Sequence, residues 1–247
     1  MDDSLRGSYP VRAQEVGKEG TICLKYLRTT IFWTLLRPFS GWTRQRRMRS
    51  YTVLMGINES MSILDLGGKP RIWESVPLCL NLTILNLPGA VEDHENGVAG
   101  SNLRSTATQH KIHYVEGDAC DVQQFAGRSF DSVFSNSVIE HVGGGGKQEA
   151  FASEVRRLGK SYWVQTPAKW FPVEAHCGMP FWWFYPAPLR RHLIERWRKN
   201  LPAWTEMVEG TTILTKKQMQ RLFPEATILT ERFLGIPKSY IAYFNGK

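Results

Sequence analysis

Cysteine is scarce in this chain, and no segment of it is both long and uniformly apolar. The four cysteines lie far apart, without C-x-x-C or C-x-x-H spacing, at Cys23, Cys79, Cys120 and Cys177. Their scatter argues against a zinc site or a disulfide framework, so we expect no metal and a reduced, cytoplasmic setting. The most apolar stretch, residues 21–36, is interrupted by Lys25 and Arg28 and is too short to span a bilayer. Residues 1–8 are acidic and polar, unlike a signal peptide.

Acidic residues are few in the first part of the chain, where basic residues gather. The formal charge is +8, and residues 1–50 carry ten Lys or Arg against four Asp or Glu, whereas residues 61–165 carry nine against twelve. Such a basic flank suits nucleic acid, anionic lipid or a phosphorylated substrate, and it equally suits a solvated surface. Hydrophobic content of 42% is ample for a folded core of one large domain with appendages.

Residues 62–68, Ser-Ile-Leu-Asp-Leu-Gly-Gly, combine a short apolar run with a glycine turn. The apolar residues suit a buried strand, and the two glycines let the chain turn tightly and let a ligand approach the backbone. Asp65 lies at the carboxyl end of this strand, which is where ligands bind in open α/β sheets. The stretch predicts a nucleotide-like cofactor over the turn. The alternative is a strand that ends in a turn without a ligand, because it would have the same pattern.

Alternating strands and helices follow this stretch. Strands are expected at residues 62–66, 82–87, 112–116, 130–135, 162–165, 227–233 and 239–244. Helices are expected from Pro70, through Ile139 and His141, around Phe151 to Leu158, and after a Thr215 cap. This βαβ rhythm predicts a doubly wound, mostly parallel α/β sheet. The last two strands are joined so tightly that they must pair antiparallel.

The expected division of the chain has two parts. Residues 1–57 would form a helical extension that packs on the main domain or covers it as a lid, and residues 58–247 would form the domain itself. Within the domain, residues 166–210 read as an insertion that follows the fifth strand. Residues 89–110 are polar and long for a connection, so they read as a weak helix with loops or as a functional loop. The tetraglycine at 143–146 reads as a flexible joint.

Taken together, these motifs resemble the class I S-adenosylmethionine-dependent methyltransferases, closest to the broad bacterial small-molecule ("type 11") group. The resemblance covers about residues 60–245. It rests on Ile-Leu-Asp-Leu-Gly-Gly at 63–68, Glu-Gly-Asp-Ala at 116–119, Phe-Asp-Ser-Val-Phe-Ser-Asn-Ser-Val-Ile-Glu-His-Val at 130–142 and the closing hairpin. The family implies a Rossmann-like doubly wound sheet of seven strands with the last strand antiparallel, bound S-adenosylmethionine, and methyl transfer to a nucleophile.

The resemblance also implies which residues bind the cofactor. They are Asp65, Gly67, Gly68, Asn86, Leu87, Gly117, Asp118, Ala119, Ser135 and Asn136. Asn86 would bond the ribose hydroxyls and Asp118 the adenine amino group. Two positions depart from the family pattern: Lys69-Pro70 replaces the next glycine of the turn, and Asn86 replaces the usual acid, so that it bonds a hydroxyl without charge assistance.

Three other functions share this architecture or its composition. A dehydrogenase would need G-x-G-x-x-G and an acid about 20 residues later, which the chain lacks in full. An adenine-N6 nucleic-acid methyltransferase would be expected to carry an Asp/Asn-Pro-Pro-aromatic turn where this chain has Ser135-Asn136-Ser137. A non-catalytic protein that kept the fold and binds S-adenosylmethionine is compatible with the altered glycine turn.

The acceptor side carries three candidate catalytic residues. Glu174 and His176 share a face if their segment after the fifth strand is extended, and either can take a proton from an acceptor hydroxyl. His141, just after the fourth strand, is the reserve. A structural role is the alternative for each of the three. The expected reaction is methylation of a small or lipid-linked molecule, with O-methylation favoured.

Aromatic and basic residues dominate the rest of this insertion. The residues expected to bind the acceptor are Trp170, Phe171, Phe181, Trp182 and Tyr185. The run 181–185 is equally compatible with core or with a partner or membrane surface. A basic amphipathic helix over residues 190–199 can rest on an anionic membrane or cover the core with its charges in water, so peripheral membrane contact stays open while nucleic acid is disfavoured. The oligomeric state has no signal in the sequence.

Overall fold

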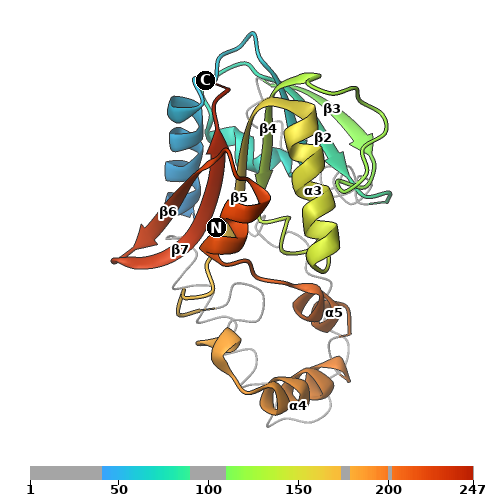
Figure 1. The fold of residues 1–247 in the computed structure, drawn as a ribbon, viewed down its shortest axis with the longest axis vertical. Coiled ribbons are helices and arrows are strands. Elements are labelled where there is room, and N and C mark those ends of the chain that lie inside the picture. Colours follow the sequence, from blue (N-terminus) through green and yellow to red (C-terminus); the bar gives the residue numbers. More distant parts are fainter. Residues whose placement is uncertain (1–40, 90–109, 174–178, 200–201, 247) are drawn as a thin grey trace, which may run out of the picture.

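A computed structural model of the protein describes residues 41–89, 110–173, 179–199 and 202–246 (Figure 1). The helical spacing expected between residues 21 and 40 and most of the loop expected at 89–110 lie outside these ranges. Within the ranges, no helix is both long and apolar enough to cross a membrane.

The centre of the molecule is a seven-stranded sheet in the order β3-β2-β1-β4-β5-β7-β6. Its strands are β1 (Ser62–Leu66), β2 (Asn81–Asn86), β3 (Lys111–Glu116), β4 (Phe130–Asn136), β5 (Gly159–Pro167), β6 (Thr227–Phe233) and β7 (Ile236–Phe244). The first five strands run parallel, and β7 pairs antiparallel with both β5 and β6. The predicted sheet of seven strands with an antiparallel last strand is therefore confirmed. Strand order reverses between β1 and β4, where open α/β sheets bind ligands.

One face of the sheet is covered by α3 (Gly145–Leu158) and α6 (Lys216–Leu222). The expected apolar stripe of α3, Phe151, Val155 and Leu158, is fully buried against the strands. Thr215 caps α6 as predicted, because Thr215 and Gln218 form a reciprocal capping box that satisfies two backbone N–H groups.

The other face is covered by the helix of residues 41–54 and by the short 3-10 helix η1 (Pro70–Ser75). The Tyr51 ring lies edge-on to Phe134 at 4.9 Å and to Trp163 at 5.7 Å. Such pairs add about 0.5–1.5 kcal/mol each beyond the burial of their area. Helix 41–54 is thus part of the core. The expected boundary between residues 57 and 58 lies between this helix and the first strand along the chain, but helix and sheet pack against each other in the fold.

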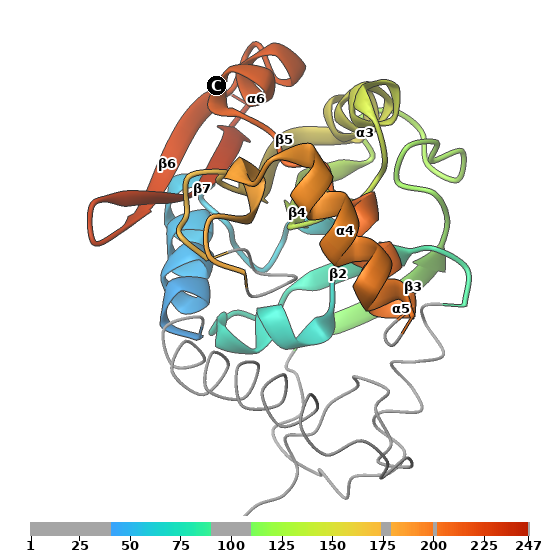
Figure 2. The same ribbon diagram turned by 90° about the horizontal axis from the view of Figure 1, so that it is seen from below.

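A third packed unit lies beyond the carboxyl ends of the parallel strands (Figure 1). It consists of η2 (Trp182–Phe184), α4 (Ala187–Arg198) and α5 (Pro202–Gly210), and we call residues 179–199 and 202–210 the cap. Its own small core is built on Trp182, Trp197 and Val208. Seen from below, α4 crosses in front of the ends of β2 and β4 (Figure 2). The cap therefore lies over the edge of the sheet where a ligand is expected.

Three local expectations need correction. Residues 139–141 form a turn instead of a helix, in which the His141 N–H donates to the Val138 carbonyl oxygen at 2.7 Å. This turn follows Ser137, whose φ of 58° breaks the helical path. The tetraglycine is not simply a joint, because Gly145 and Gly146 already belong to α3. The helix expected from Pro70 is only one 3-10 segment, since Val76 is extended before Pro77.

Candidate functional site

The glycine turn after β1 is tightly enclosed. Gly67 has φ +72°, and its N–H donates to the Leu85 carbonyl oxygen at 2.8 Å. A Cβ on Gly67 would lie 2.7 Å from a methyl carbon of Val138, and one on Gly68 would lie 1.8 Å from a carboxylate oxygen of Asp65. Both positions therefore exclude a side chain, for reasons that lie within the fold itself.

Asp65, at the start of this turn, is completely buried. Its Oδ2 accepts a hydrogen bond from Trp73 Nε1 at 2.7 Å, and its Oδ1 has no partner among the described residues. Burial raises the pKa of this carboxyl to about 7, against the opposing effect of the Trp73 bond. The turn thus holds an acid with one occupied oxygen and one oxygen that lacks a donor.

The ends of β2 and β3 present polar groups at the neighbouring edge. Asn86 donates through Nδ2 to the Gly68 carbonyl oxygen at 3.1 Å, which ties the end of β2 to the glycine turn. Leu87, next along, is 61% exposed. The Gly117 N–H donates to the Asn86 carbonyl oxygen at 2.8 Å, and so the loop that begins with Gly117, Asp118 and Ala119 starts beside Asn86.

Asp118 is an ionised acceptor at this edge. Its Oδ1 accepts from the Cys120 N–H at 2.8 Å, and its Oδ2 pairs with Lys147 Nζ at 3.2 Å. The Cys120 backbone bond, more than Lys147, holds its pKa below the usual range. With 44% of the side chain exposed, the carboxylate keeps room for a further donor.

The end of β4 carries two polar side chains with different roles. Ser135 is buried and donates to the Leu66 carbonyl oxygen at 3.1 Å, so it ties β4 to β1. Asn136 Oδ1 accepts from Arg47 Nη1 at 2.6 Å. Arg47 comes from helix 41–54, is buried, and also donates to Gln165 Oε1 at 3.1 Å and to Glu231 Oε2 at 2.5 Å.

Arg47 thus joins helix 41–54 to four strands, since its Nη2 also lies 3.5 Å from the Ser239 hydroxyl oxygen of β7. Burial opposes the charge on Glu231, but the Arg47 charge and hydrogen bond outweigh it and hold the pKa of Glu231 below its usual range. The basic run at 44–49 was visible in the sequence, but its reach to β4, β5 and β6 was not, because 89 residues separate Arg47 from the nearest of these partners along the chain.

His141 is the one candidate catalytic residue that the structure describes. Its Nδ1 lies 3.3 Å from the hydroxyl oxygen of Thr211, and the Thr212 N–H donates to the Glu140 carbonyl oxygen at 2.7 Å. These contacts attach the end of the cap to the loop that follows β4. Glu174 and His176 lie outside the described residues, in a segment flanked by a bridge between Val173 and Pro180.

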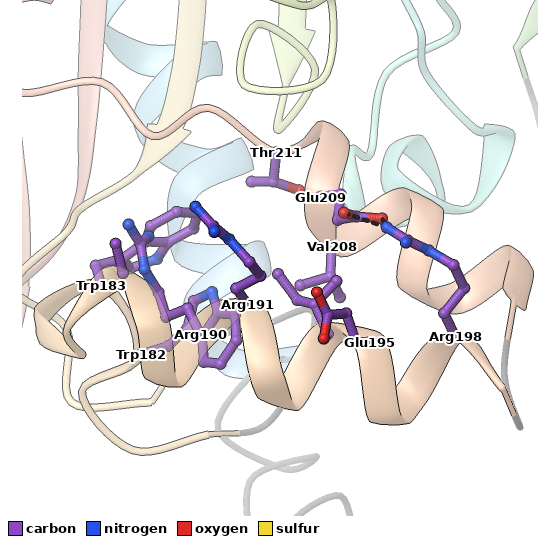
Figure 3. A pocket seen from close by; sticks show the side chains of 11 residues that line it. Trp182, Trp183, Arg190, Arg191, Glu195, Arg198, Val208, Glu209 and Thr211 are labelled. Atoms are coloured by element: carbon purple, nitrogen blue, oxygen red, sulfur yellow. Dashed lines mark hydrogen bonds and ion pairs between the residues drawn. The ribbon is translucent and has the colours of Figure 1, made fainter.

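The cap contains a cavity of about 390 Å³ (Figure 3). It is lined by Trp182, Trp183, Ala187, Arg190, Arg191, Ile194, Glu195, Arg198, Val208, Glu209 and Thr211. Thr211, which contacts His141, thus also belongs to the cavity wall. The spacing of the arginines along the basic helix was recognised in the sequence, but not that they face a cavity.

Of the five aromatic residues expected to bind the acceptor, only Trp182 lines this cavity. It is buried and packs on Trp197 with ring centroids 5.2 Å apart, and Tyr185 packs on it in turn at 5.8 Å. Trp170 is 61% exposed and packs on Phe184, and Phe171 lies edge-on to Phe233. Phe181, also exposed, has a left-handed φ of 51° at the start of η2.

Comparison with known proteins identifies the class. Residues 90–161 match a family described as "Methyltransferase domain". Among solved structures, an O-methyltransferase family protein from Burkholderia thailandensis has a TM-score of 0.51 at 12% identity, over 87% of this chain and 58% of its own. The N-methyltransferase NodS from Bradyrhizobium japonicum WM9 has a TM-score of 0.49 at 11% identity, over 84% and 96%. No protein of curated function matches the chain.

The fold and the family match define this chain as an S-adenosylmethionine-dependent methyltransferase with a class I fold. The described strand ends fit the cofactor: Asn86 offers an acceptor to hydroxyls, and Asp118 offers an ionised acceptor to an amine. The unpartnered Oδ1 of Asp65 points to a missing donor at the same turn.

Proposed function

We propose that this enzyme methylates an oxygen of a small-molecule or lipid-linked acceptor that is held beneath the cap. The observation that carries the proposal is the contact between Thr211, which lines the cap cavity, and His141, which follows β4. It joins an open cavity of the cap to the edge of the sheet where the cofactor belongs. The scattered cysteines support the cytoplasm as the place of the reaction.

The cofactor, when bound, supplies an electrophilic methyl group on a sulfonium. Asn86 and Asp118 would hold its ribose and adenine ends, and Gly67 with Gly68 would let its amino-acid end approach the backbone. The residues of this chain must then align the acceptor with the methyl group and exclude water. The position of the cap over the strand ends suits both tasks.

Removal of the acceptor proton falls to His141 in this proposal. If Nδ1–H donates to the Thr211 hydroxyl oxygen, Nε2 keeps its lone pair and can accept a proton. Thr211 then fixes the tautomer that a base requires. His176, assisted by Glu174, remains the alternative base expected from the sequence.

Transfer of a labelled methyl group tests the proposal. The protein is incubated with methyl-tritiated S-adenosylmethionine and a panel of hydroxylated and aminated aromatic acceptors. We expect label on oxygen, and a loss of about 10²–10³ in maximal rate for His141→Ala with cofactor affinity unchanged. His192→Ala, an exposed histidine of α4, is the matched control. Transfer to amines alone would overturn O-methylation, and full rate in His141→Ala would move the role to His176.

A second candidate function is cofactor binding without turnover. It is favoured by one observation: Lys69 and Pro70 stand where the family has its next glycine, and Trp73 from the same segment occupies an oxygen of Asp65. Calorimetry with S-adenosylmethionine that shows binding, together with no label transferred to any acceptor, would establish this function in place of the first.

A further inference from the structure

The cap cavity carries more positive charge than its acids neutralise. Three arginines and two glutamates line it. Arg198 is engaged, since its Nη2 lies 2.5 and 2.6 Å from the two carboxylate oxygens of Glu209. Arg190 and Arg191 have no ion pair with any described residue, and Arg190 Nε is buried without a partner. Two neighbouring guanidinium groups therefore line the cavity without an ion pair to any residue in the described part of the chain.

Arg190, the partly buried member of this pair, is directed into the cap, whereas Arg191 lines the cavity from an exposed position on α4. Figure 3 shows their side chains rising from α4 toward the side where Thr211 lies, with Trp183 beside Arg190. Arg190 is only partly exposed, although α4 is a surface helix. A purely solvated basic face would carry its guanidinium groups outward, where water satisfies every donor.

The cavity also has an aromatic and apolar lining. Trp182, Trp183 and Ile194 provide it beside the arginines, and Trp182 packs on Trp197 with ring centroids 5.2 Å apart. Rigid indole faces suit a planar, apolar body. Guanidinium groups suit oxyanions, because they donate two parallel hydrogen bonds to a carboxylate or phosphate. The cavity thus combines groups that bind an oxyanion with groups that bind a planar, apolar body.

We propose that the cap cavity is the binding site of the methyl acceptor, and that this acceptor is a planar, apolar molecule with an anionic oxyacid group, a carboxylate or a phosphate, bound by Arg190 and Arg191. The proposal rests on the proposed function, because it names the substrate class of the same site. The anionic group binds at the two arginines, and the body of the acceptor lies against the tryptophans. Thr211 marks the end of the cavity that faces His141, so the methylated group lies there.

Binding of simple probes to the whole protein tests this without turnover. The probes are 1-naphthoate, 1-naphthyl phosphate and the uncharged methyl naphthoate, titrated in the presence of S-adenosylhomocysteine and followed by tryptophan fluorescence and calorimetry. We expect at least one anion to bind about tenfold or more tighter than the ester, and the better anion identifies the oxyacid. Equal binding of ester and anions would overturn the proposal.

Arginine variants on α4 distinguish binding in the cavity from attraction to the overall positive charge of the helix. Arg190→Gln and Arg191→Gln should each weaken the anion about tenfold, with S-adenosylhomocysteine affinity and melting temperature unchanged. Arg190→Lys should restore binding in part, because lysine keeps the charge without the planar fork. The matched control is Arg196→Gln, an exposed arginine of α4 outside the cavity. An equal loss in Arg196→Gln, or a preference of all forms for phosphatidylglycerol vesicles over the soluble anions, would overturn the proposal in favour of a basic membrane-facing surface.

Turnover then distinguishes the two proposals from each other. If 1-hydroxy-2-naphthoate and its methyl ester are methylated equally well, the enzyme is a methyltransferase whose acceptor needs no anion, and only this inference fails. If the anion binds with the arginine dependence above but no hydroxylated or aminated acceptor receives label, the methyl-transfer proposal fails and the cavity is an anion site without an acceptor role.

Discussion

The sheet and the cap are stabilised in different ways. The sheet has a packed core on each face, whose largest side chains, among them Trp73, Trp163 and Phe151, are completely buried. The cap has one small core of three buried residues, and its inner wall carries arginines. Burial of apolar side chains stabilises the sheet. The cap buries fewer apolar side chains, because part of its inner wall consists of charged residues. Regions that bind ligands are commonly drawn from the less stable part of a fold.

The largest expected difference between the two regions comes from tryptophan truncation. Trp163→Ala in the sheet should lower the free energy of unfolding by about 4 kcal/mol, since it leaves a large cavity in a core closed on all sides. Trp197→Ala in the cap should loosen the cap while the sheet and S-adenosylhomocysteine binding persist. Urea unfolding and calorimetry measure both. If Trp197→Ala lowered the free energy of unfolding of the whole protein as much as Trp163→Ala does, the cap and the sheet would unfold as one unit.

The buried acid of the sheet should make stability depend on pH. Asp65 has a folded pKa of about 7 against an ordinary value of 3.8. Because the folded state holds this proton more tightly, the free energy of unfolding should fall as pH rises from 4 to 7, by on the order of 3 kcal/mol. Asp65→Asn should flatten this slope in urea titrations of the cofactor-free protein.

Glu74→Gln, an exposed acid in the neighbouring η1, is the control for that experiment and should leave the slope intact. An unchanged slope in Asp65→Asn would mean that the carboxyl is ionised in the fold. Excess S-adenosylmethionine should reduce the slope in the native protein if the cofactor supplies the donor that Oδ1 lacks.

Substitution of one glycine in each region by alanine should change the free energy of unfolding by different amounts. Gly68→Ala drives a Cβ into the Asp65 carboxylate, so we expect a loss of about 2–3 kcal/mol in the free energy of unfolding and weaker cofactor binding. Gly210→Ala, at the end of α5, meets no atom within 4 Å and should change stability little. Comparable losses at the two positions in urea unfolding would contradict the enclosed geometry of the turn after β1.

The smallest effect is expected at the helix that follows the cap. Thr215→Ala removes the hydroxyl that accepts from the Gln218 N–H at 3.2 Å and should cost about 1 kcal/mol. Lys216→Ala, one residue later and outside the capping box, is the control and should be neutral within error. Both are measured by thermal and urea unfolding. A neutral Thr215→Ala would show that packing of Met219 alone holds α6 in place.

The sequence predicted what depends on neighbouring residues. Strand β1 and the Thr215 cap were predicted at the observed residues, because apolar runs and capping boxes are local patterns. The turn at residues 139–141 was not predicted, since it depends on the left-handed Ser137 and on contacts with the cap. The packing of Tyr51 into the core was equally invisible, because its partners Phe134 and Trp163 are distant in sequence.

The candidate site divides in the same way. Asp65, Gly67 and Asp118 could be predicted as site residues from the sequence because their motifs are continuous. The convergence of Arg190, Arg191 and Thr211 on one cavity was not, because two helices and the loop after α5 must first be folded to bring them together. The buried position of Arg47 among β4, β5 and β6 also required the whole sheet.

The position of β7 between β5 and β6 has a consequence for synthesis of the protein. The strand made last lies inside the sheet, so while β7 is still in the ribosome β5 presents an unpaired edge to the cell. Apolar side chains of β5 that are buried in the folded protein are then exposed, in a chain that emerges at only about 5–20 residues per second. Nascent chains of this protein are therefore expected to depend on chaperones until β7 is released and pairs on both sides.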